Sequence, residues 1–91
     1  MISIVTPHYN GSVFHKQFFE SLMKQTFIDW ELIIIDDFSE KTHYLNLKYF
    51  ISKDSRIHLI RNKTNKGVSF SRNRGLLKAK GSFIAFLDID D

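Results

Sequence analysis

Three carboxylates follow the last apolar stretch of the sequence. Residues 83–87 are apolar, and Asp88, Asp90 and Asp91 come directly after them. In an extended segment, side chains two positions apart point to the same side, so Asp88 and Asp90 would repel each other unless a cation lay between them. Oxygen-only ligands favour Mg²⁺ or Mn²⁺, and an incomplete set of protein ligands leaves room for phosphate oxygens. A solvated acidic turn is the alternative.

A second acidic pair, Asp36 and Asp37, follows the segment 31–35, which is apolar from Leu32 onward. Adjacent side chains of an extended segment point to opposite sides, so at most one of the two faces a ligand. An ionised carboxylate in such a position can accept hydrogen bonds from a base N–H or a ribose hydroxyl. A turn or helix-capping role is the alternative.

Charge is distributed unevenly along the 91 residues. The formal net charge is +3, and eight of the 13 Lys and Arg residues lie between Arg56 and Lys80, where there is no acidic residue. In this segment Arg72 could pair with a phosphate, and Gly67 allows the backbone to approach a ligand closely. A basic segment beside carboxylates suggests an anionic, phosphate-bearing ligand, with a solvated basic face as the alternative.

Several classes of site are excluded by composition. The chain has no cysteine, so it has neither disulfides nor thiolate–metal centres. No apolar run approaches the ~18–20 residues of a membrane span. The four histidines do not cluster at the spacing of metal ligands, and we interpret His8 as a bystander beside the site. The glycine-rich phosphate-binding motifs and serine-nucleophile motifs are also absent.

The elements that must position these residues alternate between strand and helix. Apolar periodicity predicts strands at 2–5, 31–35, 57–60 and 82–87 and helices at 12–23, 42–52 and 68–79. Pro7 is expected to end the first strand, and Gly75 to weaken the third helix. This alternation predicts a Rossmann-like, three-layer αβα fold with a mostly parallel sheet of about four strands.

The ends of the predicted strands place one site. In open sheets of this kind, ligands bind at the carboxyl ends of the strands, near the point where the strand order reverses. Three of the four strands end in polar groups, which read TPHYN, DDFS and DIDD. We therefore expect these three segments to form one ligand site.

With these residues identified, the whole sequence resembles an inverting family-2 glycosyltransferase of the A-type fold. SIVTPHYN resembles the opening strand and P-x-Y-N of that family, and SLMKQTFIDWELIIIDDFS resembles its S-x-x-x-Q-T-x-x-x-W-E-hydrophobic-DDGS stretch. NKGVSFSRNRGLLKAKGSFIAFLDIDD resembles N-x-G-x-S-x-A-R-N-x-G followed by A-x-G-x-(Y/F)-hydrophobic-F-L-D-x-D-D. Such ordered blocks are far more specific than a lone D-x-D.

The resemblance implies roles for six residues. Pro7 and Tyr9 would shape the floor under the nucleotide base, and Asp37 would bond the base. Arg72 would lie near the base or the diphosphate. The D-x-D acids would be the metal-binding pair, with Asp88 near the ribose or a metal-bound water and Asp90 on the Mn²⁺ or Mg²⁺ ion that bridges the diphosphate.

Two positions depart from the pattern of the family. Phe38 replaces the glycine of the DDGS motif. This departure affects what is expected for the backbone of that turn and for the nearby pocket wall. His8 stands where the family usually has threonine or a similarly small residue.

The resemblance further implies an enzyme that transfers sugar from a nucleoside-diphosphate sugar, with UDP as the expected nucleotide, to a hydroxyl of a saccharide or lipid-linked acceptor. Residues 1–91 would be its nucleotide-sugar-binding part, truncated just after the D-x-D motif, with no catalytic base in the chain. We expect this part alone to be inactive, with an incompletely covered fourth strand that favours self-association. The implied location is cytoplasmic, at the membrane face where bacterial polysaccharides are built.

Two other functions remain as alternatives. The run ELIIIDD also resembles the acidic pair of a phosphoacceptor receiver domain, although in a receiver this pair ends the first strand. The basic segment could instead bind nucleic acid, but it lacks the interleaved stacking aromatics of single-strand platforms.

Overall fold

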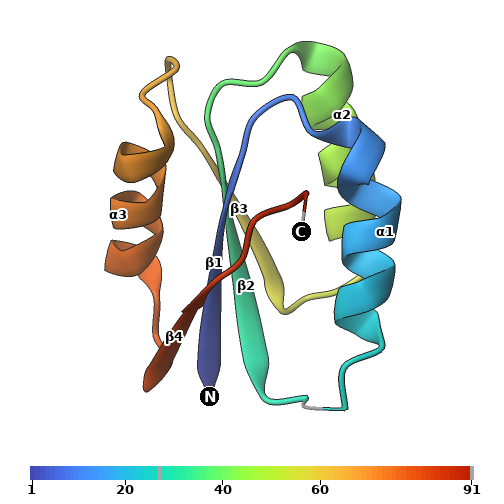
Figure 1. Ribbon diagram of the computed structural model, residues 1–91, viewed down its shortest axis with the longest axis vertical. Helices are drawn as coiled ribbons and strands as arrows, with labels where there is room; N and C mark the ends of the chain where they lie inside the picture. The colour runs from blue at the N-terminus through green and yellow to red at the C-terminus, as the bar shows by residue number, and fades with distance from the viewer. Residues whose placement is uncertain (27, 91) are drawn as a thin grey trace.

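The computed structural model describes residues 1–26 and 28–90. Along these residues, strands and helices alternate in the predicted order (Figure 1). The elements are β1 (Ile2–His8), α1 (Ser12–Met23), β2 (Trp30–Asp36), α2 (Lys41–Ile51), β3 (Ile57–Arg61), α3 (Val68–Lys78) and β4 (Phe83–Phe86).

The strands form one parallel sheet in the order β3-β2-β1-β4. Helices α1 and α2 cover one face and α3 covers the other, which confirms the predicted three-layer αβα fold (Figure 1). The chain builds outward from β1 through β2 to β3 and then returns to place β4 on the other side of β1. The strand order therefore reverses between β1 and β4, where ligands bind in open sheets.

The core lies between the sheet and the α1–α2 layer. All seven residues of β2 are buried, as its continuous apolar run predicted for a central parallel strand. On this face Leu32 and Ile34 of β2 pack with Phe18 and Leu22 of α1 and with Leu47 of α2. None of the helices in the described part of the chain is long and apolar enough to cross a membrane.

The prediction that Pro7 ends β1 is wrong, because the strand continues to His8. Leu87 of the segment after β4 donates a hydrogen bond to the carbonyl of Val5, so the backbone groups of Val5 face β4. Those of Pro7, two residues further on, face the same side. The ladder with β4 ends at the pair Val5–Phe86, so the missing N–H of Pro7 interrupts no hydrogen bond.

Strand β4 is shorter than predicted and is largely uncovered. It ends at Phe86, and a turn at Ile89 and Asp90 replaces an extended D-x-D segment. All four of its residues are exposed, and Phe83 keeps 71% of its surface accessible. This confirms the expectation of an incompletely covered fourth strand.

The effect expected of Gly75 on α3 is outweighed by packing against the sheet. Gly75 is buried where α3 crosses β1, and a Cβ atom there would overlap the side chain of Val5. Helix α3 forms across this position. The glycine therefore lowers intrinsic helix propensity but permits close contact between helix and strand.

Candidate functional site

A cavity of about 350 Å³ lies where the strand order reverses. It is lined by Pro7, His8, Tyr9, Asn10, Gly11, Phe14, Asp37, Val68, Ser71, Arg72, Asp88, Ile89 and Asp90. All six residues singled out from the sequence, Pro7, Tyr9, Asp37, Arg72, Asp88 and Asp90, are among them. The ends of β1, β2 and β4 thus contribute to one cavity.

Asp37 organises the side of the cavity that borders α3. One of its carboxylate oxygens accepts hydrogen bonds from the Lys66 amide (2.7 Å) and the Asn62 side chain (2.9 Å). The other accepts one from the Gly67 amide at 2.8 Å. Gly67 has φ 93°, a backbone conformation that glycine adopts without strain. Since a carboxylate has about four acceptor positions, these three bonds leave one on the second oxygen for a ligand donor.

Asp36 points away from this side, as predicted for adjacent acids. Its carboxylate is fully buried and accepts hydrogen bonds from His8 Nδ1 (2.8 Å), the Ser39 hydroxyl (2.6 Å) and Arg61 Nε (3.2 Å). Burial alone would raise the pKa of Asp36, but the hydrogen bonds from His8 and Ser39 hold it below the usual value. Asp36 is therefore an ionised structural acid.

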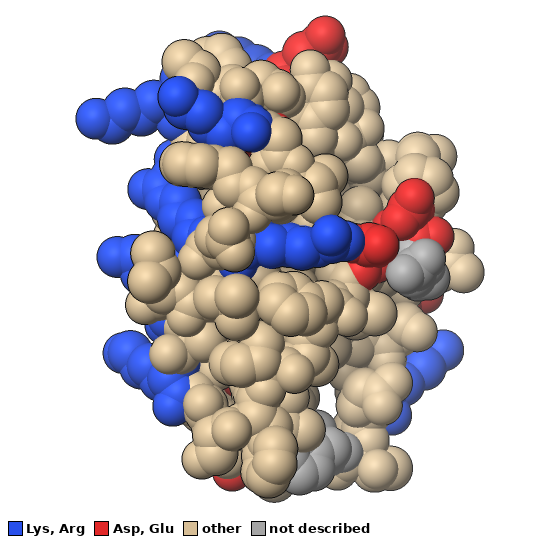
Figure 2. Space-filling model, turned by 60° about the vertical axis from the view of Figure 1, so that its left-hand side comes forward, with Lys and Arg blue, Asp and Glu red and all other residues tan. Residues whose placement is uncertain are grey.

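The D-x-D acids follow β4 and line the same cavity as Asp37. Asp88 is partly exposed and Asp90 is exposed, whereas Ile89 between them is buried in the core. Arg72 Nη2 lies 3.4 Å from Asp88, and Arg72 Nε is a buried donor without a hydrogen-bond partner in the described residues. Figure 2 shows basic side chains spread over the side of the molecule that carries α3, and one of them reaches a group of acidic side chains.

The donor set at Asp88 and Asp90 fits a divalent ion shared with a ligand. No group of three or more metal-ligating side chains occurs within residues 1–26 and 28–90, so these residues supply two carboxylates at most. Two hard oxygen donors and vacant coordination positions are typical of Mg²⁺ or Mn²⁺ sites completed by phosphate oxygens. The unpartnered Arg72 Nε beside them is a further donor for an anion.

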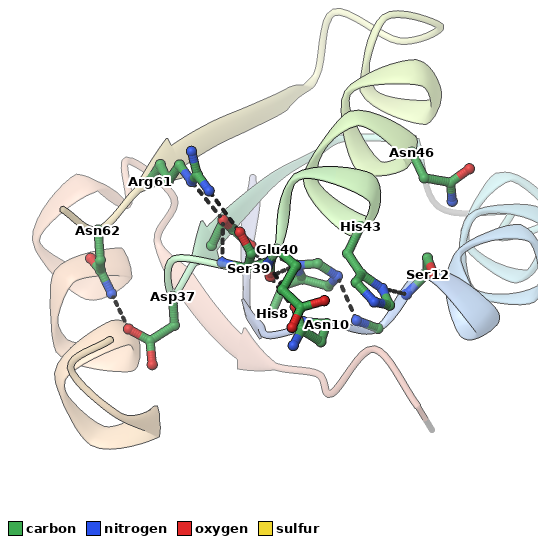
Figure 3. A network of polar contacts seen from close by, with 12 residues as sticks. His8, Asn10, Ser12, Asp37, Ser39, Glu40, His43, Asn46, Arg61 and Asn62 are labelled. Carbon is green, nitrogen blue, oxygen red and sulfur yellow. Dashed lines mark hydrogen bonds and ion pairs between the residues drawn. The ribbon is translucent and has the colours of Figure 1, made fainter. Parts of the chain in front are cut away.

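His8 is more than the bystander that its sequence position suggested. It is 2% exposed and lies at the centre of a polar network that joins the β1–α1 and β2–α2 loops (Figure 3). Its neighbours there include Asp36, Gly11 and His15. No pattern in the sequence could have predicted this network, because its partners are up to 31 positions apart and no motif links them.

Phe38 adopts the backbone conformation for which the family uses glycine. Its φ is 63°, in the left-handed region, and its ring is about half exposed. The Arg61 guanidinium lies 4.8 Å from the ring centroid, a distance typical of a cation–π contact. The turn therefore keeps the glycine-like shape despite the substitution.

Comparison with known proteins identifies the family. Residues 3–91 match the model of glycosyl transferase family 2. The chain belongs to this family. It is 41% identical over 92 residues to the UDP-Glc:alpha-D-GlcNAc-diphosphoundecaprenol beta-1,3-glucosyltransferase WfgD of Escherichia coli. It is 35% identical over 91 residues to a putative teichuronic acid biosynthesis glycosyltransferase, TuaG, of Bacillus subtilis.

Solved structures show the same fold in glycosyltransferases of the A type. Residues 1–349 of TarS from S. aureus, in complex with UDP-GlcNAc, match with a TM-score of 0.88 and 28% identity over 98% of this chain and 26% of that one. The mannosyltransferase PcManGT of Pyrobaculum calidifontis, in complex with GDP-Man and Mn²⁺, matches with a TM-score of 0.89. At 16% identity over 98% of this chain and 27% of its own, this second match shows the fold alone.

The chain spans about a third of the length of the curated relatives that it matches. Both alignments include the whole of this chain but only 35% of WfgD and 36% of TuaG. The family of the chain and the fold of residues 1–26 and 28–90 are established, whereas the activity of a complete enzyme is proposed below.

Proposed function

We propose that residues 1–91 form the nucleotide-sugar-binding part of a glycosyltransferase that uses a UDP-sugar. The carrying observation is that Pro7, Tyr9, Asp37, Arg72 and the D-x-D acids line one cavity at the reversal of strand order. The relative named as using UDP-Glc and the TarS complex with UDP-GlcNAc support the choice of nucleotide.

Each lining residue has a proposed role that follows from its chemistry. Asp37 uses its remaining acceptor position for an N–H of the base, and Tyr9, 54% exposed beside Pro7, offers a flat surface against the ring. Arg72 donates hydrogen bonds to the diphosphate. Nucleotide and sugar would thus lie between the Asp37 side and the D-x-D side of the cavity.

Asp88 and Asp90 would hold Mn²⁺ or Mg²⁺ together with the diphosphate oxygens. The bound ion would offset negative charge on the departing diphosphate. We propose transfer to a hydroxyl of a saccharide or lipid-linked acceptor with inversion, through an oxocarbenium-like transition state. No residue of the cavity is assigned as the base that deprotonates the acceptor.

The names of two relatives also support a proposal for the pathway in which the enzyme acts. One relative is named for a diphosphoundecaprenol acceptor and another for teichuronic acid biosynthesis, so we propose bacterial surface-polysaccharide synthesis on the cytoplasmic side of the membrane. The exposed strand β4 is proposed to let two copies of this chain associate. The family match favours neither a receiver domain nor a nucleic-acid-binding protein.

Calorimetry with UDP, with and without Mn²⁺, tests the proposal. We expect Mn²⁺ to raise UDP affinity in the unaltered chain, and Asp90→Asn to remove most of this increase because one charged ligand is lost. Asp29→Asn is a matched control, since Asp29 is exposed and does not line the cavity. Metal-dependent affinity that survives Asp90→Asn would contradict the assignment of Asp90.

A further inference from the structure

His8 joins the two loops that form one wall of the cavity. Its carbonyl accepts a hydrogen bond from the Asp37 amide at 2.8 Å. Its Nδ1 lies 2.8 Å from an oxygen of Asp36, which begins the turn into α2. Its Nε2 accepts a hydrogen bond from the Gly11 amide at 3.1 Å, in the turn into α1. One side chain therefore holds both turns (Figure 3).

The contacts around His8 fit one neutral form of its ring, with the Gly11 amide and His15 sharing the lone pair of Nε2. A backbone amide can only donate, so Nε2 must accept from Gly11, and the ring proton lies on Nδ1, where it is donated to Asp36. The contact of 2.7 Å between His8 Nε2 and His15 Nε2 then makes His15 a donor. Asn46 completes the chain by donating to His15 Nδ1 at 2.7 Å.

The same contacts extend to the D-x-D side of the cavity. A Cβ atom on Gly11 would lie 3.0 Å from Ile89 Cγ2 and 3.2 Å from the His8 ring, so both side chains rest on this bare piece of backbone. Ile89 is the buried residue between Asp88 and Asp90. The position of Gly11 therefore affects the acids on one side, just as the contact of His8 Nδ1 with Asp36 affects the adjacent Asp37 on the other.

We propose that His8 is a positioning residue of the donor site, which in its Nδ1-protonated neutral form sets the separation between Asp37 and the D-x-D acids. This inference rests on the proposed function. The side chain of His8 is completely enclosed, so it acts through Asp36, the chain neighbour of Asp37, and through Gly11 rather than by contact with nucleotide.

Two variants separate the bonds of the ring. In His8→Asn the side-chain amide can take the place of Nδ1 and donate to Asp36, but nothing accepts from Gly11. In His8→Gln the longer side chain can accept from Gly11, but the bond to Asp36 is lost. Each variant should weaken UDP binding roughly 3- to 10-fold, the value of one hydrogen bond, and His8→Ala should weaken it more than either.

The controls are the same replacements at His58, on strand β3, which is exposed and outside the cavity. His58→Asn and His58→Gln should leave UDP affinity unchanged. All affinities are measured by calorimetry well below the unfolding temperature of each variant, so that a lower stability alone does not register as weaker binding. If His8→Ala does not fold, the Asn and Gln variants still decide the question.

Two magnetic-resonance measurements test the ring tautomer of His8 and its bond to Gly11 without any ligand. The ¹⁵N shifts of its ring should show the proton on Nδ1. Hydrogen exchange of the Gly11 amide should be faster in His8→Asn than in the unaltered chain, and close to the unaltered rate in His8→Gln. A proton on Nε2, or equal Gly11 exchange in both variants, would overturn the inference.

The UDP affinities of the His8 variants also decide between a positioning role and a purely structural one. UDP affinity in both His8 variants equal to that of the unaltered chain would overturn a positioning role and leave a purely structural one. If the unaltered chain does not bind UDP, the proposed function fails, and the inference fails with it as a statement about a donor site. Ring tautomer and Gly11 exchange would then still decide whether His8 holds the loop.

Discussion

At the scale of single residues, Phe38 is the clearest source of local strain. Its left-handed backbone conformation costs a non-glycine residue roughly 1–2 kcal/mol. Phe38→Gly should remove this cost but also the contact with Arg61, whereas Phe38→Ala removes only the contact. We therefore expect Phe38→Gly to exceed Phe38→Ala in free energy of unfolding by about 1 kcal/mol in urea titrations. Equal values would show that the turn relaxes in the alanine variant.

Asp36 and Asp37 make a second, comparative prediction. Asp37→Asn offers one oxygen to the three donors that the carboxylate accepts, so it should lose stability, about 1–3 kcal/mol, and also preference for UDP over GDP. Asp36→Asn should lose stability but keep the preference, because Asp36 is turned away from the cavity. Competition binding with both nucleotides measures this, and loss of preference only in Asp36→Asn would reverse the assignment.

The candidate site could be predicted from sequence only where local pattern carries the information. Asp37, Asp88 and Asp90 each follow an apolar run, so the strand-end rule identified them. His8, by contrast, gains its partners only when distant segments come together. Its contact with Asp36 joins residues 28 positions apart, and no spacing rule describes such a pair.

At the scale of the elements, the contact between α3 and β1 depends on Gly75. Gly75→Ala should favour the isolated helix but force its new methyl group into Val5, and the clash should win by about 1–3 kcal/mol. Asn73→Ala, at an exposed position of the same helix, should leave stability equal or slightly higher. Urea unfolding of the two variants gives the comparison. A more stable Gly75→Ala variant would mean that α3 can move away from the strand at little cost.

The strands and helices were predicted well because the spacing of apolar residues differs clearly between the two kinds of element. The buried run of β2 and the four-residue repeat of α1 left little choice of structure. The end of β1 was missed because the neighbour of a strand, not its own sequence, decides whether a proline interrupts hydrogen bonding. The end of β4 was missed for a related reason, since Leu87 is as apolar as the strand before it.

For the whole molecule, the buried His15 makes stability depend on pH. Burial, and then the neighbouring His8, lower the pKa of His15 from 6.5 to about 4. Between these values the unfolded chain binds more protons than the folded one, so the free energy of unfolding should fall as pH decreases from 6.5 to about 4. Thermal unfolding across this range measures the slope. His15→Gln should flatten it, and a slope unchanged by that variant would locate the titration elsewhere.

The uncovered strand β4 makes the molecule prone to associate through that edge. Its phenylalanines expose apolar surface beside unpaired backbone groups, a combination that favours pairing with another strand. Phe83→Lys should therefore lower the fraction of dimer at a given concentration in sedimentation velocity. Val13→Lys, on the exposed side of α1, is the control and should leave that fraction unchanged. Equal dimer fractions in both variants would exclude β4 as the contact.

Pro7 limits how far the ladder between β1 and β4 can extend. Beyond Val5, β1 has no N–H to offer at position 7, so a β4 lengthened toward the cavity would lack that hydrogen bond of the ladder. Hydrogen bonding between β1 and β4 stops where the segment after β4 turns and carries its two acids to the cavity. Pro7, which the sequence suggested as the end of β1, thus marks the end of pairing with β4. Residues 88–90 are left unpaired beside the cavity that Pro7 lines.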